Sequence, residues 1–157
     1  SLAAGPGAFG AADKRYSLSG TMALQKISYD DLNSRQRENY NFQKVSAILA
    51  DYGFVTLRLT DDWQGADFIA QHIDGETFLK VQLKGRLTLD KKYLGKNLVV
   101  CFPYQNGHWY MYPHDEVVSH LLKTTNIGNT ESWLQHGLYS MKVISQETLK
   151  HLEQYAL

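Results

Sequence analysis

The pair Asp74-Gly75 constrains this chain most, because it lies between two runs of β-type composition. An Asp-Gly pair in that setting is the strongest short-range signal for a β-hairpin. The first run covers residues 65–72 and the second covers residues 77–84. The second run alternates between an apolar face and a polar face, and the polar face carries Lys80, Gln82 and Lys84. We therefore expect two antiparallel strands.

A two-residue loop at this pair would fix the register of the hairpin. Counting back from the loop places Asp67 directly opposite Gln82, with Lys84 two residues further along the same face. Directly opposed Cβ atoms lie about 5 Å apart. A carboxylate, an amide oxygen and an ammonium group would thus meet at the open end of the hairpin. The alternative is an ordinary half-buried strand whose polar face meets only water.

The order Asp67, then Gln82-x-Lys84 across an apolar strand, resembles the PD-(D/E)XK nuclease superfamily, the restriction-endonuclease-like fold. In that superfamily the Asp opens the second core strand, and an acidic residue-x-Lys lies in the third. Asp67 and Lys84 match this pattern, whereas Gln82 stands where Glu or Asp is usual. Gln occurs there in some branches, including certain intron homing endonucleases, and also in degenerate, inactive members.

The resemblance implies hydrolysis of DNA phosphodiester bonds with Mg²⁺ or Mn²⁺, which take oxygen ligands. It makes Asp67 the anionic ligand, Gln82 a ligand through its side-chain oxygen and Leu83 a ligand through its backbone carbonyl. Lys84 would orient or deprotonate the attacking water and stabilise developing charge. Glu38 is a further candidate ligand from the first helix, and the alternative is an ordinary surface Glu. Because Gln carries no charge, we expect weaker metal binding unless Glu38 or Asp62 compensates.

Formal net charge is zero, so DNA binding would depend on a local basic patch. Between residues 80 and 96 there are six basic residues and one acidic residue. Four of the basic residues are predicted to hold the phosphate backbone and make binding salt-dependent: Arg86, Lys91, Lys92 and Lys96. The alternative is a solvated face of a neutral protein.

The order of predicted elements favours an α/β fold with a central mixed sheet flanked by helices. Helical periodicity covers about residues 33–52 and ends at Gly53, and strand patterns follow at residues 55–59, ended by a polar turn at 60–62. With the hairpin, this gives the αβββ opening of the restriction-endonuclease-like core. Further patterns predict strands at 98–102 and 109–112, a helix from Pro113 to about Leu122, a polar loop at 124–130 and a last helix capped by Ser145.

Residues 1–21 are rich in Gly, Ala and Ser and lack periodicity, so we expect a flexible or artificial leader, followed by one PD-(D/E)XK-like domain over residues 22–157. Cys101 is the only cysteine, and its apolar neighbours indicate a buried core thiol. Histidine spacing does not indicate a metal cluster. No apolar run has the length of a membrane span, and no signal peptide is evident, so the cytoplasm is the expected compartment.

The sequence leaves three functional classes open. The first is a magnesium-dependent endodeoxyribonuclease acting on double-stranded DNA, for which a homodimer would fit, because one such site cuts one strand. The second is a nucleic-acid-binding module of the same fold that has lost the catalytic acid. The third is a protein-interaction domain in which the motif is fortuitous. Trp63, near the mouth of the proposed site, is expected either to touch substrate or to plug the core.

Overall fold

The computed structural model describes residues 23–157, and the predicted leader lies outside them. The chain divides into two compact units, Ser1–Arg37 and Glu38–Leu157. In the described part of the first unit, Ser28 caps the short helix η1 (Tyr29–Asp31), and α2 (Ser34–Ala50) begins there. None of the helices within residues 23–157 has the length and apolar character needed to cross a bilayer.

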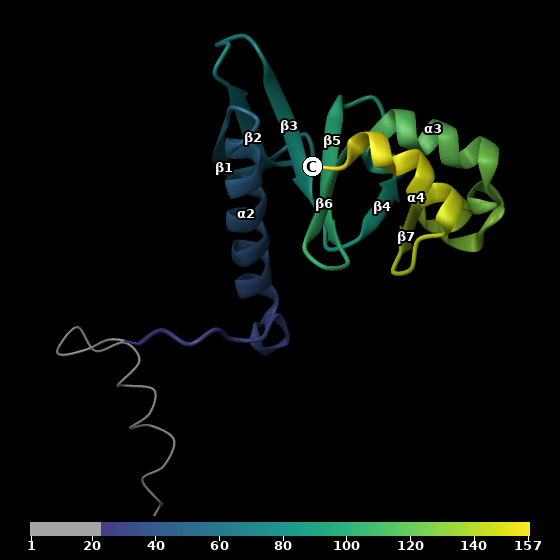
Figure 1. Cartoon of the computed structure of the whole chain (residues 1–157). Coiled ribbons are helices and arrows are strands. Elements are labelled where there is room, and N and C mark those ends of the chain that lie inside the picture. The colour runs from purple at the N-terminus through teal and green to yellow at the C-terminus, as the bar shows by residue number, and fades with distance from the viewer. Residues whose placement is uncertain (1–22) are drawn as a thin grey trace, which may run out of the picture. The chain divides into compact units, whose positions relative to one another are not determined.

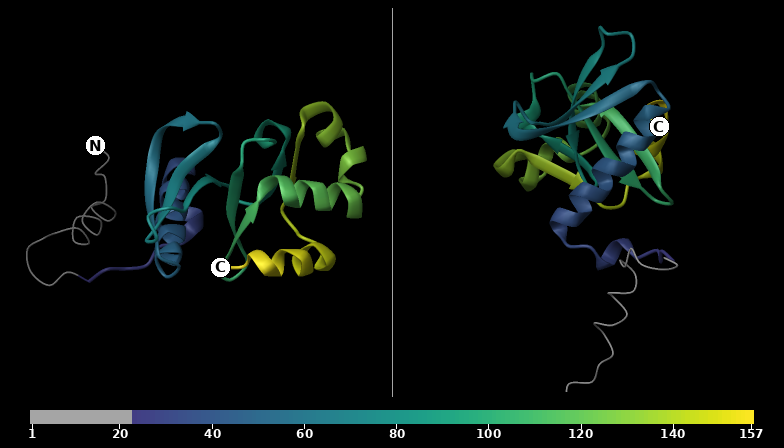
Figure 2. Two further views of the ribbon diagram at one scale, coloured as in Figure 1. Left: turned by 90° about the horizontal axis from the view of Figure 1, so that it is seen from above. Right: turned by 90° about the vertical axis from the view of Figure 1, so that its left-hand side faces the viewer.

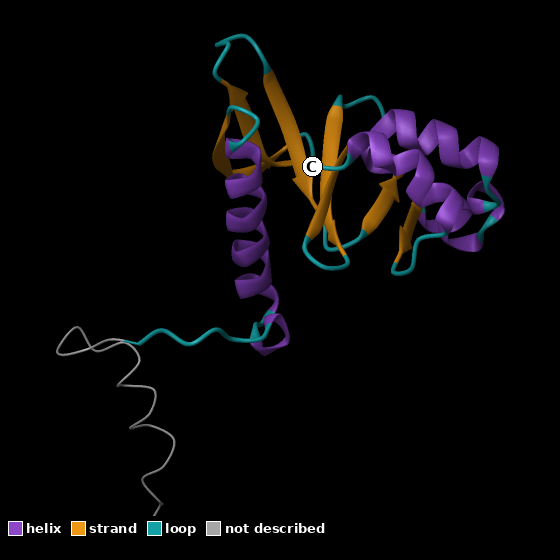
Figure 3. Ribbon diagram, viewed as in Figure 1, coloured by secondary structure: helices purple, strands orange, loops and turns teal. Residues whose placement is uncertain are grey.

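Five strands of the second unit form one sheet in the order β1-β2-β3-β5-β6 (Figures 1 and 3). Their bounds are β1 (Phe54–Trp63), β2 (Ala66–His72), β3 (Phe78–Leu83), β5 (Leu98–Tyr104) and β6 (His108–Pro113). β3 and β5 run parallel, while the other neighbours are antiparallel. The prediction of a mixed sheet with an αβββ opening is therefore confirmed.

Two layers cover the opposite faces of this sheet (Figure 2). On one face, Val45 and Leu49 of α2 pack against Phe68, Val81 and Cys101. On the other face lie α3 (His114–Thr124), α4 (Gln146–Leu152) and a two-stranded sheet of β4 (Leu87–Asp90) and β7 (Leu138–Met141). Short helical turns complete this layer: η2 (Lys91–Tyr93), η3 (Ile127–Asn129), η4 (Ser132–His136) and η5 (Glu153–Tyr155).

Several local predictions hold. Gly53 follows α2 with a φ of +81°, the left-handed conformation that ends many helices. The Ser145 hydroxyl accepts from the Thr148 amide and caps α4. Cys101 is fully buried, and burial raises the pKa of its thiol, which makes it a core residue and not a nucleophile.

The predicted end of the first strand is wrong, because β1 continues through residues 60–62 to Trp63. The chain reverses at Gln64-Gly65 instead, where both φ angles are positive, at 52° and 85°. Trp63 pairs with Ala66 across this turn, as expected for a type I′ hairpin loop. The register also shifts between Arg58 and Trp63, which marks an irregularity in the long strand.

The loop of the central hairpin is also wider than predicted. The His72 amide donates to the Thr77 carbonyl, so residues 73–76 form the loop in place of Asp74-Gly75 alone. The Asp74 carboxylate accepts from the amides of Glu76 and Thr77 and from the Thr77 hydroxyl, which builds an Asx-type turn. These hydrogen bonds hold the pKa of Asp74 below its usual range. The wider loop is symmetric about the same centre, and the strand register is therefore the predicted one.

Candidate functional site

The hairpin of β2 and β3 brings Asp67 and Gln82 together. Phe68 pairs with Val81, and the ladder continues in the predicted register toward the loop. Extending that ladder by one pair toward the open end places Asp67 opposite Gln82. The Leu83 amide donates to Asp67 Oδ2 at 2.8 Å, which fixes the carboxylate against the end of β3. The predicted meeting of these two residues is therefore present in the fold.

Gly65 holds the backbone just before Asp67 in a close-packed position. A Cβ atom at this glycine would lie 2.9 Å from Leu98 Cδ1 and 3.0 Å from Tyr93 Cδ1, distances that side-chain atoms do not tolerate. With its φ of +85°, this position also favours glycine conformationally. The tight turn at Gln64-Gly65 thus packs the start of β2 against the buried ring of Tyr93. This packing fixes the position of Asp67 at the start of the strand.

The Asp67 carboxylate lies in an environment that disfavours its charge. Although Asp67 is exposed, desolvation by the surrounding protein raises its pKa. The Leu83 hydrogen bond and the charge of Lys84 oppose this rise, whereas the charges of Glu38 and Asp62 add to it. Both acids are therefore close enough to act on Asp67 electrostatically. The Asp62 side chain is held in turn by the Gly65 amide, which donates to its Oδ1 at 2.7 Å.

Gln82 is 9% exposed, and its amide is not one of the buried side-chain groups without a hydrogen-bond partner, which within residues 23–157 are limited to Arg37 Nε. The amide therefore lies at the edge of the core, where water or a ligand can reach it. Leu83 directly follows Gln82, and the Leu83 amide points toward Asp67. Since the N–H and C=O groups of a strand residue point to the same edge, the Leu83 carbonyl also faces the Asp67 side. Two neutral oxygen donors therefore accompany one carboxylate.

Lys84 completes the constellation with an ammonium group that is also partly desolvated. Burial lowers its pKa, the charge of Lys92 lowers it further, and Asp67 and Asp90 oppose the change. Its Nζ lies 5.6 Å from the centre of the Tyr93 ring, and the Nζ of Lys92 lies 5.2 Å from the same ring. Tyr93 thus holds two ammonium groups beside the candidate site through cation–π contacts.

The short helix η2, which carries Lys92 and Tyr93, is anchored to the start of α3. His114 is fully buried, and its Nε2 accepts from the Asp90 amide at 3.1 Å. Its Nδ1 lies 3.0 Å from Asp115 Oδ1, so the ring carries its proton on Nδ1. Asp115 also accepts from the Gly95 amide. These bonds fix the loop after β4 against α3.

The residues of the predicted basic patch lie in different surroundings. Lys92 lies beside the candidate site and pairs with Asp90 at 3.6 Å. Lys91 turns away, with its Nζ 5.1 Å from the Trp133 ring centre. Arg86 is exposed in the loop between β3 and β4, and the backbone carbonyl of Lys96 accepts from the Lys80 ammonium. Only part of the predicted set therefore surrounds Asp67 and Lys84.

The oxygen donors suit a hard cation better than a transition metal. Within residues 23–157 no three His, Cys, Asp or Glu side chains gather as ligands for a metal ion. Asp67, Gln82 and the Leu83 carbonyl supply oxygen alone, and Mg²⁺ prefers oxygen and keeps several of its waters. The donor set is the observation that fits such a cation: one carboxylate and two neutral oxygen donors lie together at the end of the β2–β3 hairpin.

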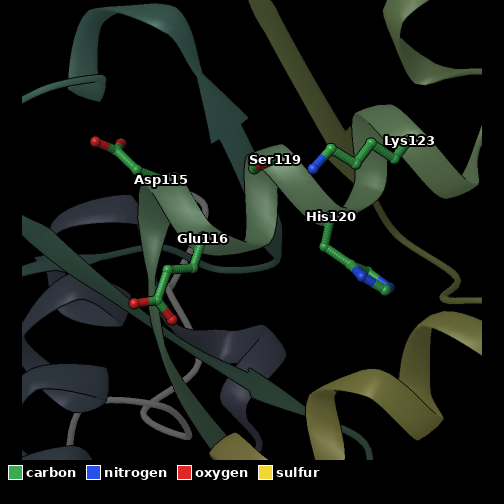
Figure 4. A pocket seen from close by; sticks show the side chains of 5 residues that line it. All are labelled: Asp115, Glu116, Ser119, His120 and Lys123. Carbon is green, nitrogen blue, oxygen red and sulfur yellow. The ribbon is translucent and has the colours of Figure 1, made fainter.

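A hollow lies on the outer face of α3 (Figure 4), lined by Asp115, Glu116, Ser119, His120 and Lys123. His120 stacks on His151 of α4 with ring centres 3.5 Å apart. Glu116 is 3.4 Å from the Tyr155 hydroxyl. The hollow contains none of the residues predicted for the nuclease site, and these contacts connect α3 with the C-terminal segment.

Two residues of the site region were missed or left undecided by the sequence analysis. Tyr93 was not considered, although its ring contacts Lys84, Lys92 and the turn before Asp67. Its place inside a basic run was the only local signal. Trp63 is half-exposed, so the alternative of a core plug is wrong.

No protein-family model matches this chain, and no curated protein matches it. Among solved structures, it is similar to Hjc, a Holliday junction resolvase from Archaeoglobus fulgidus, with 15% identity, a TM-score of 0.40 and coverage of 49% of this chain and 72% of that one. It is also similar to the bacterial homing endonuclease I-Ssp6803I, with 18% identity, a TM-score of 0.42 and coverage of 55% and 70%.

Proposed function

We propose that this protein is a metal-dependent endonuclease of the PD-(D/E)XK type, which hydrolyses DNA phosphodiester bonds at Asp67, Gln82 and Lys84. One observation carries the proposal. Asp67 and Lys84, whose pKa values are shifted in opposite directions by desolvation, lie with Gln82 at the end of one hairpin, where the Leu83 amide donates to the Asp67 carboxylate. Titratable groups with oppositely perturbed pKa values in one place are typical of sites that carry chemistry.

In this proposal, Asp67, Gln82 and the Leu83 carbonyl hold Mg²⁺ or Mn²⁺, with Glu38 and Asp62 adding negative potential. The bound cation would stabilise the charge that develops on the phosphate and the leaving oxygen. Lys84 orients a water molecule toward the phosphorus. Because its pKa is lowered, a larger fraction of its amine is neutral at a given pH and able to take the proton of that water. The attacked P–O bond breaks and leaves one phosphate end and one hydroxyl end.

The test is cleavage of a substrate panel of supercoiled plasmid, linear duplex, branched DNA, single-stranded DNA and RNA, each with Mg²⁺, Mn²⁺ or chelator. Asp67→Ala and Lys84→Ala should each lower the rate by about 10²-fold or more, the scale of a lost acid–base group or charge stabiliser. Lys44→Ala is the matched control, because its ammonium lies on α2, 5.2 Å from the centre of the Tyr40 ring. Cutting that persists in both site variants would show that another site or a contaminant is responsible.

A second candidate function is a DNA-binding module without catalysis. It is favoured by Gln82 in place of an acid and by the absence of a three-acid ligand group within residues 23–157. In that case binding should weaken steeply with salt and depend on Lys92, without any metal requirement.

A homodimer on double-stranded DNA remains part of the endonuclease proposal, and its test is the mass of the protein in solution together with paired cuts on both strands. Binding that is absent at low salt would favour the protein-interaction class.

A further inference from the structure

Trp63 is the exposed tryptophan of the described chain. Trp63 is 53% exposed, whereas Trp109 and Trp133 are 4% and 5% exposed. Single exposed apolar side chains are ordinary on protein surfaces. The position of this ring beside the candidate site is therefore what points to a ligand.

The fold holds Trp63 at the edge of the candidate site. It is the last residue of β1 and pairs with Ala66, the residue directly before Asp67. The turn that joins the two strands is fixed by the close packing of Gly65 against Tyr93 and Leu98. The ring is thus attached to a rigid hairpin end and not to a long loop, so its place beside Asp67 is built into the fold.

The ammonium group of Lys80 lies near the Trp63 ring, on the face of the sheet that also carries Gln82. The Nζ of Lys80 lies 5.9 Å from the Trp63 ring centre, and it also donates to the Lys96 carbonyl, which restrains it. Lys80 is two residues before Gln82 on β3, and alternation puts both side chains on the same face of the sheet. An exposed indole and an ammonium group therefore lie side by side next to the proposed scissile position.

We propose that Trp63 stacks on an unpaired nucleobase of the substrate, and that Lys80 holds the phosphate next to that base. The inference rests on the proposed function and specifies its substrate class: DNA with at least one unstacked base near the cleavage point. A base inside an intact duplex is already stacked on both sides, whereas an unpaired base offers a free face to an aromatic ring. The acidic neighbours Asp61 and Asp62 repel phosphate, so the DNA backbone lies on the Lys80 side of the ring.

A protein partner would cover Trp63 less well. Charged residues are depleted at the centre of protein–protein interfaces, whereas Asp61 and Asp62 directly precede Trp63 in the sequence and the Lys80 ammonium lies 5.9 Å from the centre of its ring. A nucleotide needs that combination of an aromatic face and a cation within one residue's reach. The charge pattern therefore favours a nucleotide over a second protein.

The test uses the intrinsic fluorescence of the full chain with chelator present, so that binding is measured without cutting. Titration with an oligo-thymidine single strand should quench the wild-type tryptophan fluorescence. Because Trp109 and Trp133 are buried and shielded from the DNA, this change in fluorescence reports on Trp63. Trp63→Phe should lose the quench and keep most of the affinity, measured by the anisotropy of labelled DNA. Trp63→Leu should weaken single-strand binding about tenfold, within the range for one stacked base, and leave binding to a blunt duplex unchanged.

Tyr52→Leu is the matched control, since Tyr52 is 49% exposed and precedes β1 at its opposite end, about 30 Å of strand away. An unchanged dissociation constant in Trp63→Leu, or equal quenching by duplex and single strand, overturns the inference. A signal that depends on protein concentration without DNA also overturns it, because a second copy would then cover Trp63. Loss of cleavage with retained quenching would instead refute only the proposed nuclease activity.

Discussion

Replacing Gln82 by Glu would introduce a second acid beside Asp67, as the proposed PD-(D/E)XK function would favour, and the structure allows its effect to be worked out. Repulsion from Asp67, about 5 Å away, amounts to about 3 kcal/mol at an effective dielectric constant of about 20. Attraction to Lys84, which lies about 7 Å away along the same strand face, offsets about 2 kcal/mol of this repulsion. The two Coulomb contributions nearly cancel, so desolvation decides the outcome.

The Gln82 position is only 9% exposed. A carboxylate there loses several kcal/mol of hydration, part of which it avoids by taking up a proton. We expect Gln82→Glu to lower the free energy of unfolding by about 3 kcal/mol at pH 8 in chelator. For a domain of this size that corresponds to about 6–12 °C in melting temperature. The loss should shrink at pH 5, where the carboxyl group is protonated more easily.

Magnesium should reverse the sign of this effect. A second anionic ligand strengthens cation binding, and we expect at least a tenfold tighter dissociation constant for Mg²⁺ in Gln82→Glu by calorimetry. Gln71→Glu is the matched control, because it adds the same charge to β2 four residues from Asp67. If Gln82→Glu melts like wild type in chelator and binds Mg²⁺ no more tightly, then Gln82 and Asp67 do not share one site and the constellation is refuted.

Three further perturbations test parts of the site by themselves. Asp67→Asn should raise the melting temperature at pH 8 while abolishing cutting, because the folded state raises the pKa of this carboxyl group and its ionisation therefore costs stability as pH rises. Lys92→Gln should raise the pKa of Lys84, followed by NMR of ¹³C-labelled lysine, since the Lys92 charge lowers it. Gly65→Ala should lower the free energy of unfolding by well over 1 kcal/mol in denaturant titrations, because positive φ and the clash add together.

Each of these has a control that isolates the cause. Asp61→Asn removes a neighbouring exposed charge and should change the melting temperature by little. Lys91→Gln should leave the pKa of Lys84 unchanged, because Lys91 lies over Trp133. Gly75→Ala introduces the same positive-φ strain at 73° with no neighbour within 4 Å, so the difference between the two glycine variants measures the clash. Equal losses at both glycines would mean that the turn before Asp67 is not tightly packed.

The part of the site that lies within one hairpin could be predicted from the sequence. Alternation along β3 determined which residues share a face, and the Asp-Gly pair determined the centre of the loop. The loop is wider than predicted, yet Asp67 still lies opposite Gln82, because widening a hairpin symmetrically adds residues to both sides equally. The strand register of a hairpin can therefore be predicted correctly even where the type of turn is not.

Contacts between distant segments could not be predicted in this way. Tyr93 meets Lys84 only because η2 is anchored by His114, which lies on α3 beyond two further strands. The end of β1 was misplaced because the polar residues 60–62 resemble a turn in composition, while the residues that adopt positive φ are Gln64 and Gly65. The small sheet of β4 and β7 was missed because strands of four residues are too short to show periodicity.

The opposite pKa shifts of Asp67 and Lys84 have one consequence for metal binding that does not depend on the reaction. Both shifts favour the neutral forms, so the site without metal holds fewer separated charges than its residue types suggest.

A cation requires the ionised carboxylate and repels the ammonium, so binding should release protons from both groups. The Mg²⁺ affinity should therefore rise from pH 5 to pH 8. Calorimetry in two buffers of different ionisation enthalpy measures the released protons, and Asp67→Asn should abolish most of the binding. Proton release of zero over that range would show that the metal binds away from Asp67.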